Sequence, residues 1–472
     1  MKLNIKQYYK VSILAIALTL SSCSIDDIEP VNKLTTENTI RDEASAQMVL
    51  NGVYSLGKAF DVSFFPLHLA AYGNEGIITG FMSGSTGFNV NDVPVNNTFL
   101  SNLYNGQYKI INSANFLIQE LEAGKAIGIA EDKKLIMISE AKFQRAFAYF
   151  NLVRYFGEFY DLNSDKGVVL RTTFSNEFEA QARNSVKEVY NQIEEDLLFA
   201  SQNGPIYIDH FYSGSLASKA LLAKVYLYEG KYAEASALAD EVIFNDEGYV
   251  LEAEYSAIFK NSFNSSEVIF APFTGPDQEG KTNMQQVSRT TYSQTLKSLA
   301  DAQVGTDNDG SLATTGSGYD PRFQYAYSSA TKGSNSNGKY PFLDNLQSQG
   351  NTLYHLRLGE IYLIKAEAEA RSQSGDLTIA LNNLNQIRTR AGVEPKELSD
   401  KATLLEDIRQ EKLLELFFEN GEGWFDIVRY DILGNLEASD IKPTVTSQNQ
   451  FVLPLPSQVI IGNNALIQNT GY

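Results

Sequence analysis

Residues 214–245 read GSLASKALLAKVYLYEGKYAEASALADEVIFN, and this stretch is the clearest indication of the fold class. Its apolar residues recur at helical spacing over 214–229 and 231–245, and Gly230 separates the two runs. Small residues on both runs let two antiparallel helices approach closely, and larger apolar residues fill the seam between them. The sequence therefore predicts a helix pair of the tetratricopeptide type.

A second helix pair with the same pattern follows further along the chain. A shift of 145 residues places Ala223 on Ala368, Gly230 on Gly375, Tyr232 on Leu377, Ala235 on Ala380, Ala239 on Leu384 and Val242 on Ile387. Chance similarity between two amphipathic helices is the alternative explanation. Because about a hundred residues separate the two pairs, the chain is not a plain tandem repeat array.

Helical periodicity also dominates the rest of the chain and predicts an all-α dominated fold. The expected helices cover 41–58, 101–122, 131–156, 185–201, 214–229, 231–245, 353–373, 376–391 and 403–419. We expect a single domain over 39–472, in which 39–249 and 351–430 form the helical scaffold and 431–472 a C-terminal tail.

Two stretches interrupt the helical pattern. Residues 250–350 form an insertion rich in Gly, Ser, Thr and Asn, and residues 72–97 are rich in Gly. Long loops on a rigid scaffold are where ligand binding usually occurs. We therefore expect an irregular, loop-rich ligand-binding region built from these two stretches.

The N-terminus has the features of an export signal. Lys2, Lys6 and Lys10 precede an apolar run over 11–20, which is too short to span a bilayer. Leu20-Ser21-Ser22-Cys23 then matches a bacterial lipoprotein cleavage site, so we expect a signal peptide at 1–22, lipidation of Cys23 and a tether over 23–38. A free cysteine in an ordinary signal sequence is the alternative.

Composition excludes several classes of function. The chain of 472 residues carries 57 acidic and 38 basic side chains, a net charge of −19. An acidic excess of this size repels phosphate backbones, which disfavours nucleic-acid binding. The chain has one cysteine, so disulfide frameworks and thiolate metal sites are excluded. Neither a metal nor a cofactor is expected.

Catalytic motifs are weak. Residues 275–282 fit the phosphate-loop pattern, but Asp277 and Glu279 would place negative charge inside the anion cradle, so a surface loop is favoured. The histidines at 68, 210 and 355 form no zinc motif, and residues 307–310 lack the distal glutamate of a calcium loop. None of these motifs therefore indicates a catalytic site.

Several fragments become specific when they are taken in order. They are AQMVLNGVY at 46–54, AKFQRAFAYFNLVRYFG at 141–157, YDPRF at 319–323, LRLGEIYLIKAEA at 356–368, LNQIRTRAG at 384–392, 411–416, WFDIVR at 424–429 and QNTGY at 468–472. Together with the lipoprotein signal, they resemble the SusD/RagB family of outer-membrane nutrient-binding lipoproteins over essentially the whole mature chain. The fragment at 420–424 departs from the family pattern, in which an Arg often precedes the Trp.

The resemblance implies a binding protein at the cell surface, not an enzyme. Members of this family cover a SusC-like TonB-dependent transporter barrel in the outer membrane, capture oligosaccharides and deliver them inward. Capture of peptides or other small nutrients, without affinity for glycans, is the alternative. The charged motif residues Arg145, Arg154, Glu360 and Glu367 lie in strongly apolar helices, where we expect them to be paired and structural.

The expected ligand contacts lie in the two loop-rich stretches. Sugars stack on aromatic faces and hydrogen-bond to amide and carboxylate side chains. The single Trp, Trp424, belongs to a scaffold motif, so Tyr and Phe must provide the platforms. The ligand-binding candidates are Asn74, Glu75, Phe81, Phe88 and Tyr292.

Overall fold

A computed structural model describes residues 38–79, 86–177, 179–207, 209–275, 284, 290–303, 320–322, 325, 338–341 and 350–472. The expected signal peptide, Cys23 and nearly all of the tether lie outside these residues. So do Phe81, most of the phosphate-loop-like segment and residues 307–310. Within the described ranges, no helix combines the length and the apolarity needed to cross a bilayer.

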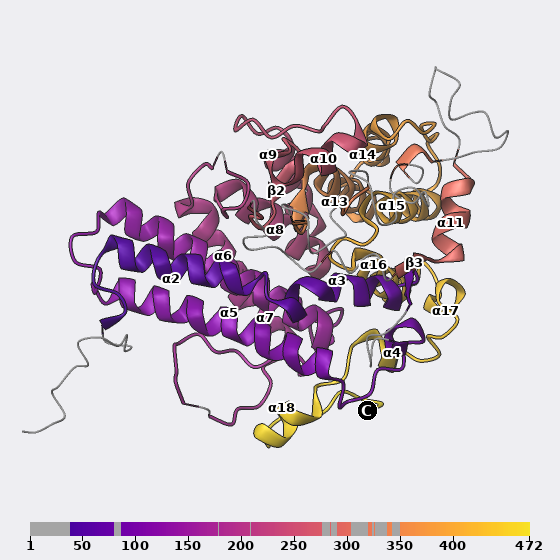
Figure 1. Cartoon of the computed structure of the whole chain (residues 1–472). Helices are drawn as coiled ribbons and strands as arrows, with labels where there is room; N and C mark the ends of the chain where they lie inside the picture. Colours follow the sequence, from indigo (N-terminus) through magenta and orange to yellow (C-terminus); the bar gives the residue numbers. More distant parts are fainter. Residues whose placement is uncertain are drawn as a thin grey trace, which may run out of the picture.

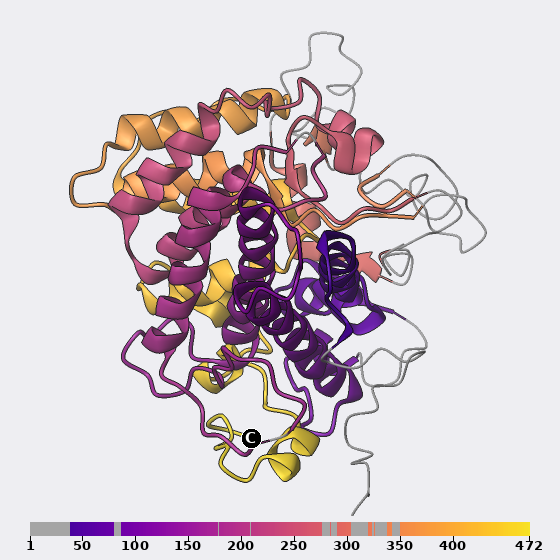
Figure 2. The ribbon, with the colours of Figure 1, turned by 90° about the vertical axis from the view of Figure 1, so that its left-hand side faces the viewer.

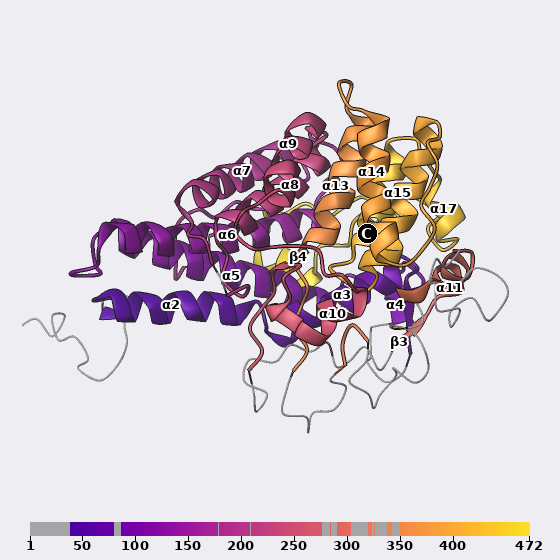
Figure 3. The same cartoon turned by 90° about the horizontal axis from the view of Figure 1, so that it is seen from above.

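Antiparallel helices form one continuous stack (Figures 1 and 3). In chain order the stack contains α5 (Thr98–Glu122), α6 (Glu131–Phe156), α7 (Val186–Asn203), α8 (Ser215–Glu229), α9 (Tyr232–Ile243), α13 (Leu358–Arg371) and α14 (Leu377–Arg390). Each helix packs on the next, and α13 packs on α9. The two tetratricopeptide-like pairs are therefore neighbours in space although the insertion separates them in sequence. The prediction of an all-α dominated fold is confirmed.

The residues that align the two pairs serve the packing predicted for them. Ala223, Ala235 and Ala239 in the first pair are fully buried, as are Ala368, Ala380, Leu384 and Ile387 in the second. Gly230 ends α8 with φ +75°, a left-handed conformation that favours glycine. Gly375 is required for a different reason, because a Cβ there would lie 2.0 Å from the carbonyl oxygen of Glu369.

The remaining helices surround this stack. They are α2 (Glu43–Leu56), α3 (Phe60–Tyr72), α4 (Thr86–Asn89), α10 (Tyr255–Asn261), α11 (Gln294–Asp301), α15 (Lys401–Leu416), α16 (Glu422–Ile432), α17 (Ala438–Ile441) and α18 (Ser457–Gly462). Periodicity missed α3 because its sequence, FDVSFFPLHLAAY, is apolar on all sides and contains Pro66. The C-terminal segment that carries α18 lies at the base of the molecule and contacts α5 (Figures 1 and 2).

Within the described part of the chain, four short strands connect the insertion to the scaffold. β1 (Gly76–Ile78) pairs antiparallel with β3 (Thr290–Tyr292), and β2 (Val268–Phe270) pairs antiparallel with β4 (Leu356–Arg357). The first pair joins the two loop-rich stretches that the sequence analysis singled out. The second pair places the start of α13 beside the segment that leaves α10.

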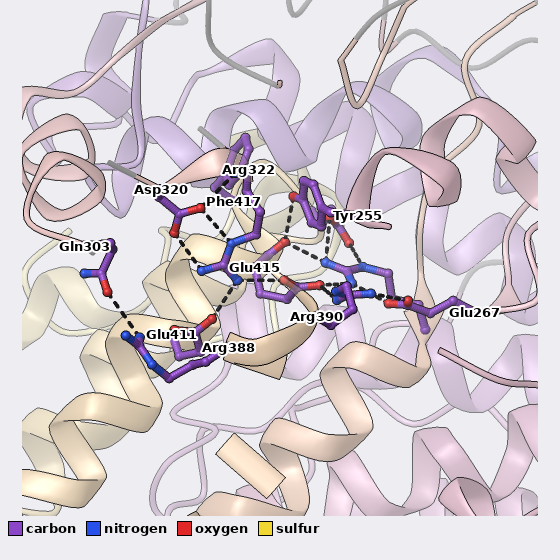
Figure 4. Close-up of polar contacts among 12 residues, drawn as sticks. Tyr255, Glu267, Gln303, Asp320, Arg322, Arg388, Arg390, Glu411, Glu415 and Phe417 are labelled. Atoms are coloured by element: carbon purple, nitrogen blue, oxygen red, sulfur yellow. Dashed lines mark hydrogen bonds and ion pairs between the residues drawn. The ribbon is translucent and has the colours of Figure 1, made fainter. Parts of the chain in front are cut away.

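A cluster of buried ion pairs also holds the insertion against the scaffold, and Figure 4 shows most of its members. We call Glu267, Arg322, Arg357, Arg390 and Glu415 the charged centre. Glu415 on α15 accepts hydrogen bonds from Arg357 Nη1 at 2.5 Å, from Arg322 Nη1 at 2.8 Å and from Arg390. Glu267 from the insertion binds Arg357 at 2.9 Å and also Arg390. All five side chains are at least 95% buried, so loss of one partner would leave charges without compensation.

The charged residues of the family-like fragments are paired in the same way. Arg145 binds Asp196 at 2.6 Å and Arg154 binds Glu422 at 2.8 Å. Glu360 binds Lys224 at 2.7 Å, and Glu367 binds Arg429 at 2.8 Å. The predicted pairing of these four buried charges is confirmed.

Candidate functional site

A pocket of about 440 Å³ opens between the N-terminal helices and the start of the insertion. Its walls come from α2, α3, α5 and α6, from the segment before α8, from the end of β2 and from the residues before β4 and α16. The volume lies within the range of about 300–1,000 Å³ that is typical of small-molecule sites. This pocket is the strongest candidate for a ligand site among the described residues.

Aromatic rings form much of the wall: Tyr54, Phe147, Tyr155, Phe211, Tyr212 and Phe273. The rings of Tyr54 and Tyr212 meet edge to face at 5.8 Å, and those of Phe211 and Phe273 lie 5.1 Å apart. These contacts join α2, the segment before α8 and the segment after β2 into one apolar surface. Such a surface can accept the C–H face of a sugar ring or an apolar side chain.

Amide side chains supply the polar part of the wall: Asn51, Gln107, Gln144, Asn151 and Asn420. Asn151 Oδ1 accepts a hydrogen bond from Arg154 Nη2 at 2.7 Å, so a buried guanidinium orients this amide. The amide nitrogen of Gln144 is buried and has no hydrogen-bond partner among the described residues. An amide offers both donors and acceptors without charge, which suits hydroxyl groups.

The imidazole of His355 is neutral and its tautomer follows from its partner. Asn420 Nδ2 donates to the carbonyl oxygens of Tyr354 and His355, so Asn420 Oδ1 is left as an acceptor. His355 Nδ1, at 3.1 Å from this oxygen, therefore carries the proton. Burial lowers the pKa of His355 to about 4, which keeps the ring uncharged at neutral pH.

A buried carboxyl lies behind the aromatic wall. Glu140 on α6 accepts hydrogen bonds from Tyr207 Oη at 2.5 Å and from Tyr54 Oη. Burial raises the pKa of Glu140 to about 7, although the two tyrosine hydroxyls act to lower it. Glu140 itself is not a lining residue, and Tyr54 lies between its carboxyl and the pocket. The carboxyl therefore positions a ring of the wall.

The described wall of the pocket offers aromatic faces and amides rather than acidic groups. The described lining residues include no aspartate or glutamate, whereas glycoside hydrolysis generally needs two carboxyl groups across the scissile bond. In the part of the chain that the structure describes, no group of three or more His, Cys, Asp or Glu side chains could hold a metal ion.

The residues expected from the sequence lie elsewhere. Asn74 donates to Thr295 Oγ1 at 2.9 Å and to the Ile441 carbonyl at 2.8 Å, with φ +64°. Glu75 is fully buried and accepts from the Phe418 amide at 2.6 Å. Phe88 is fully buried 4.5 Å from the His68 ring, and Tyr292 stacks on Phe418 at 5.6 Å. These four do not line the pocket; their role as ligand contacts stays a prediction, as does that of Phe81.

The sequence does contain a signal for the pocket that the loop-based reasoning missed. Residues 144, 147, 148, 151 and 155 of α6 all line it. Their spacing places them on one face of a helix, where two amides alternate with aromatic and small residues. Amides on an otherwise apolar, buried helix indicate a face that meets something polar.

A second, wider groove of about 840 Å³ lies on another side of α5. Tyr104, Tyr108, Lys109, Arg171, Glu177 and Gln458 are among its lining residues. Asn112 fixes its rim by hydrogen bonds in both directions with the backbone of Ser175. The groove has charged groups of both signs in its wall, unlike the first pocket.

Comparison with known proteins places the chain in a family. Residues 273–472 match the SusD family, and residues 27–227 match a SusD-like family described as starch-binding and associating with the outer membrane. The chain belongs to the SusD/RagB family. SusD-like protein P2 of Formosa agariphila is 26% identical to it over 98% of this chain and 99% of that protein.

Solved SusD structures share the fold. A SusD superfamily protein from Bacteroides thetaiotaomicron superposes with a TM-score of 0.73 and 24% identity, covering 91% of this chain and 99% of that one. A laminarin binding SusD-like protein superposes with a TM-score of 0.66 and 22% identity, covering 92% and 100%. The SusD/RagB family consists of binding proteins.

Proposed function

We propose that this SusD/RagB protein captures oligosaccharides at the cell surface and delivers them to a SusC-like TonB-dependent transporter barrel. In this proposal the chain is lipidated at Cys23, which anchors it in the outer membrane with the domain facing the exterior. It binds its ligand without changing it. The tetratricopeptide-like helices act as the scaffold and contact the barrel.

The observation that carries the proposal is the composition of the 440 Å³ pocket, where aromatic faces alternate with amide side chains. Stacking on C–H faces and hydrogen bonding to hydroxyls are the two interactions that a sugar ring offers. The match to a family described as starch-binding and the likeness to a laminarin binding protein support a glycan ligand. A peptide or another small nutrient is the alternative occupant.

Calorimetric titration of purified, lipid-free protein (Cys23→Ala) tests ligand capture. The titrants are host, plant and algal oligosaccharides and mixed peptides. We expect a saccharide to bind without formation of product. Tyr212→Ala should lower the affinity about tenfold or more, because a stacking platform in the pocket is lost. Phe244→Ala, which removes a ring that is 76% exposed outside the pocket, serves as the matched control and should leave the affinity unchanged.

The outcome separates the two ligand classes. Binding of a peptide with no response to any saccharide would overturn the glycan assignment and favour the alternative. Equal losses from Tyr212→Ala and Phe244→Ala would remove the pocket from the proposal. Delivery is tested separately by isolating the protein from outer membranes in mild detergent, where a transporter barrel should copurify with it.

A further inference from the structure

The described lining of the pocket carries almost no charge. Among its described lining residues there is no aspartate, glutamate or arginine, and Lys58 is the only charged side chain. Lys58 Nζ already donates a hydrogen bond to the carbonyl oxygen of Phe273 at 3.1 Å. His355 adds no charge, because burial keeps its ring neutral. The remaining polar groups of the wall are amides and hydroxyls.

The charges behind the wall do not favour an anion either. Arg154, which touches the pocket residue Asn151, is paired with Glu422 at 2.8 Å. Lys224 shares this carboxylate and is also paired with Glu360 at 2.7 Å, so both cations have acidic partners. Among the residues that the structure describes, Glu140, behind Tyr54, forms no ion pair and accepts hydrogen bonds only from tyrosine hydroxyls. A negative ligand would therefore meet one engaged lysine and, once Glu140 ionises, a like charge behind the ring of Tyr54.

A charged ligand would also lose its hydration when it enters. Transfer of an ion from water into a site without a matched counter-ion is far more costly than transfer of a hydroxyl that regains hydrogen bonds. The amides of the wall restore the hydrogen bonds of hydroxyl groups and offer no counter-charge. The wall thus discriminates by charge rather than by size alone.

We infer that the pocket selects uncharged saccharides and rejects glycans that carry a carboxylate or sulfate in the bound segment. This inference rests on the proposed function, because it specifies the class of glycan for the same site. It also predicts that charge could be introduced into the wall to change the class of ligand.

Matched ligands that differ in charge provide the test. The neutral glycan that binds best is oxidised at C6, which converts primary hydroxyls to carboxylates, and part of the product is converted to its methyl ester. We expect the oxidised glycan to bind at least tenfold more weakly than the parent, and the methyl ester to recover most of the affinity. The ester controls for the change in shape at C6.

A substitution that adds a positive charge to the pocket wall should increase the affinity for a negative ligand, so its effect cannot be explained by the loss of a contact. Asn51 is an exposed lining residue of α2, and Asn51→Lys places a second cation at the pocket. It should raise the affinity for the oxidised glycan about fivefold or more. Met48→Lys adds the same charge on the same helix at a side chain that is 67% exposed and outside the lining, and should change the affinity less than twofold.

The possible failures are distinguishable. Equal binding of parent and oxidised glycan, or equal gains from Asn51→Lys and Met48→Lys, would overturn the inference while the proposed glycan capture stands. No recovery with the methyl ester would also overturn it, since shape would then explain the loss. Absence of binding by every neutral and charged glycan would defeat the proposed function, and this inference with it.

Discussion

A buried glutamate has a lowered pKa in the charged centre and a raised pKa behind the pocket wall. Burial alone would raise the pKa of Glu415, but the guanidinium groups of Arg390, Arg357 and Arg322 outweigh it and hold this pKa well below its usual range. Glu140 is also buried, but among the described residues it accepts only from tyrosine hydroxyls, and burial raises its pKa to about 7. Paired charged side chains therefore gather where the insertion meets the scaffold, whereas the described surface that would contact a ligand is almost uncharged.

The largest effect should come from breaking the charged centre. Glu415→Gln keeps the shape of the side chain but leaves Arg322, Arg357 and Arg390 without their shared counter-charge. We expect the free energy of unfolding to fall by about 3–5 kcal/mol, the cost typical of removing one partner of a buried ion pair. Urea denaturation at neutral pH measures it.

An exposed ion pair provides the control for that experiment. Lys297 and Asp301 on α11 lie 2.6 Å apart with side chains that are 51% and 41% exposed. Asp301→Asn should cost less than about 1 kcal/mol, because water and salt screen such pairs. Similar losses for Glu415→Gln and Asp301→Asn would show that the charged centre contributes no more than a surface contact.

The second effect concerns the pH dependence of stability near the pocket. In the folded protein Glu140 holds its proton up to about pH 7, whereas in the unfolded chain it releases it near the ordinary value of 4.5. The folded state therefore binds more protons between these values, and stability falls as the pH rises through this window. Between pH 5 and pH 8 the free energy of unfolding should therefore fall by about 2–3 kcal/mol less in Glu140→Gln than in the wild type.

Denaturation of both proteins at the two pH values gives this difference directly. Glu75, whose pKa burial also raises to about 7, contributes a similar slope, but it does so in both proteins and cancels. Parallel pH profiles for the wild type and Glu140→Gln would mean that the carboxyl behind Tyr54 does not titrate in this range.

The third effect should be seen in binding rather than in stability. Gln107 on α5 is a lining residue that is 98% buried, and Gln107→Leu removes its polar atoms while keeping its approximate size. We expect the saccharide affinity to fall about three- to tenfold, the value of one hydrogen bond. The free energy of unfolding should change by less than about 1 kcal/mol.

The same helix supplies a matched control. Gln119 lies on α5 but is exposed and outside the lining, so Gln119→Leu should leave the affinity unchanged. A fall in stability without a fall in affinity for Gln107→Leu would assign this amide to the scaffold and weaken the role of the pocket.

The sequence predicted the scaffold better than the site, for a physical reason. Helical periodicity shows which face of each segment is buried. The nine expected helices, including both tetratricopeptide-like pairs, therefore lie within a few residues of the expected bounds, except that the helix expected at 353–373 starts later, at Leu358. A pocket forms where segments that are distant in sequence come together in the fold. Phe147 of α6, Tyr212 before α8 and Asn420 before α16 meet only after folding.

Loop composition also does not show which residues a side chain contacts after folding. Phe88 is an aromatic residue in a Gly-rich stretch, and it packs against His68 and Phe65 in the core. Glu75 is a polar residue of the same stretch, and its carboxyl group accepts a hydrogen bond from the Phe418 amide. The role of these loop residues as ligand contacts stays a prediction, and Tyr292→Ala tests it for one of them, because a loss of affinity there would extend the binding surface beyond the pocket.

The smallest expected effect is the dependence of binding on salt. Exposed charges lose most of their mutual attraction over a Debye length, which falls from about 30 Å at 0.01 M to about 3 Å at 1 M salt. A neutral saccharide in a wall of amides and rings has no net charge to screen, so calorimetry between 20 mM and 500 mM sodium chloride should show less than about a twofold change in affinity. Asn51→Lys with an oxidised glycan should lose affinity several-fold over the same range, because its added attraction is ionic. A steep salt dependence in the wild type would instead indicate a ligand held by ionic contacts. Lys109 and Arg171 in the mixed-charge groove offer such contacts, whereas the described wall of the 440 Å³ pocket does not.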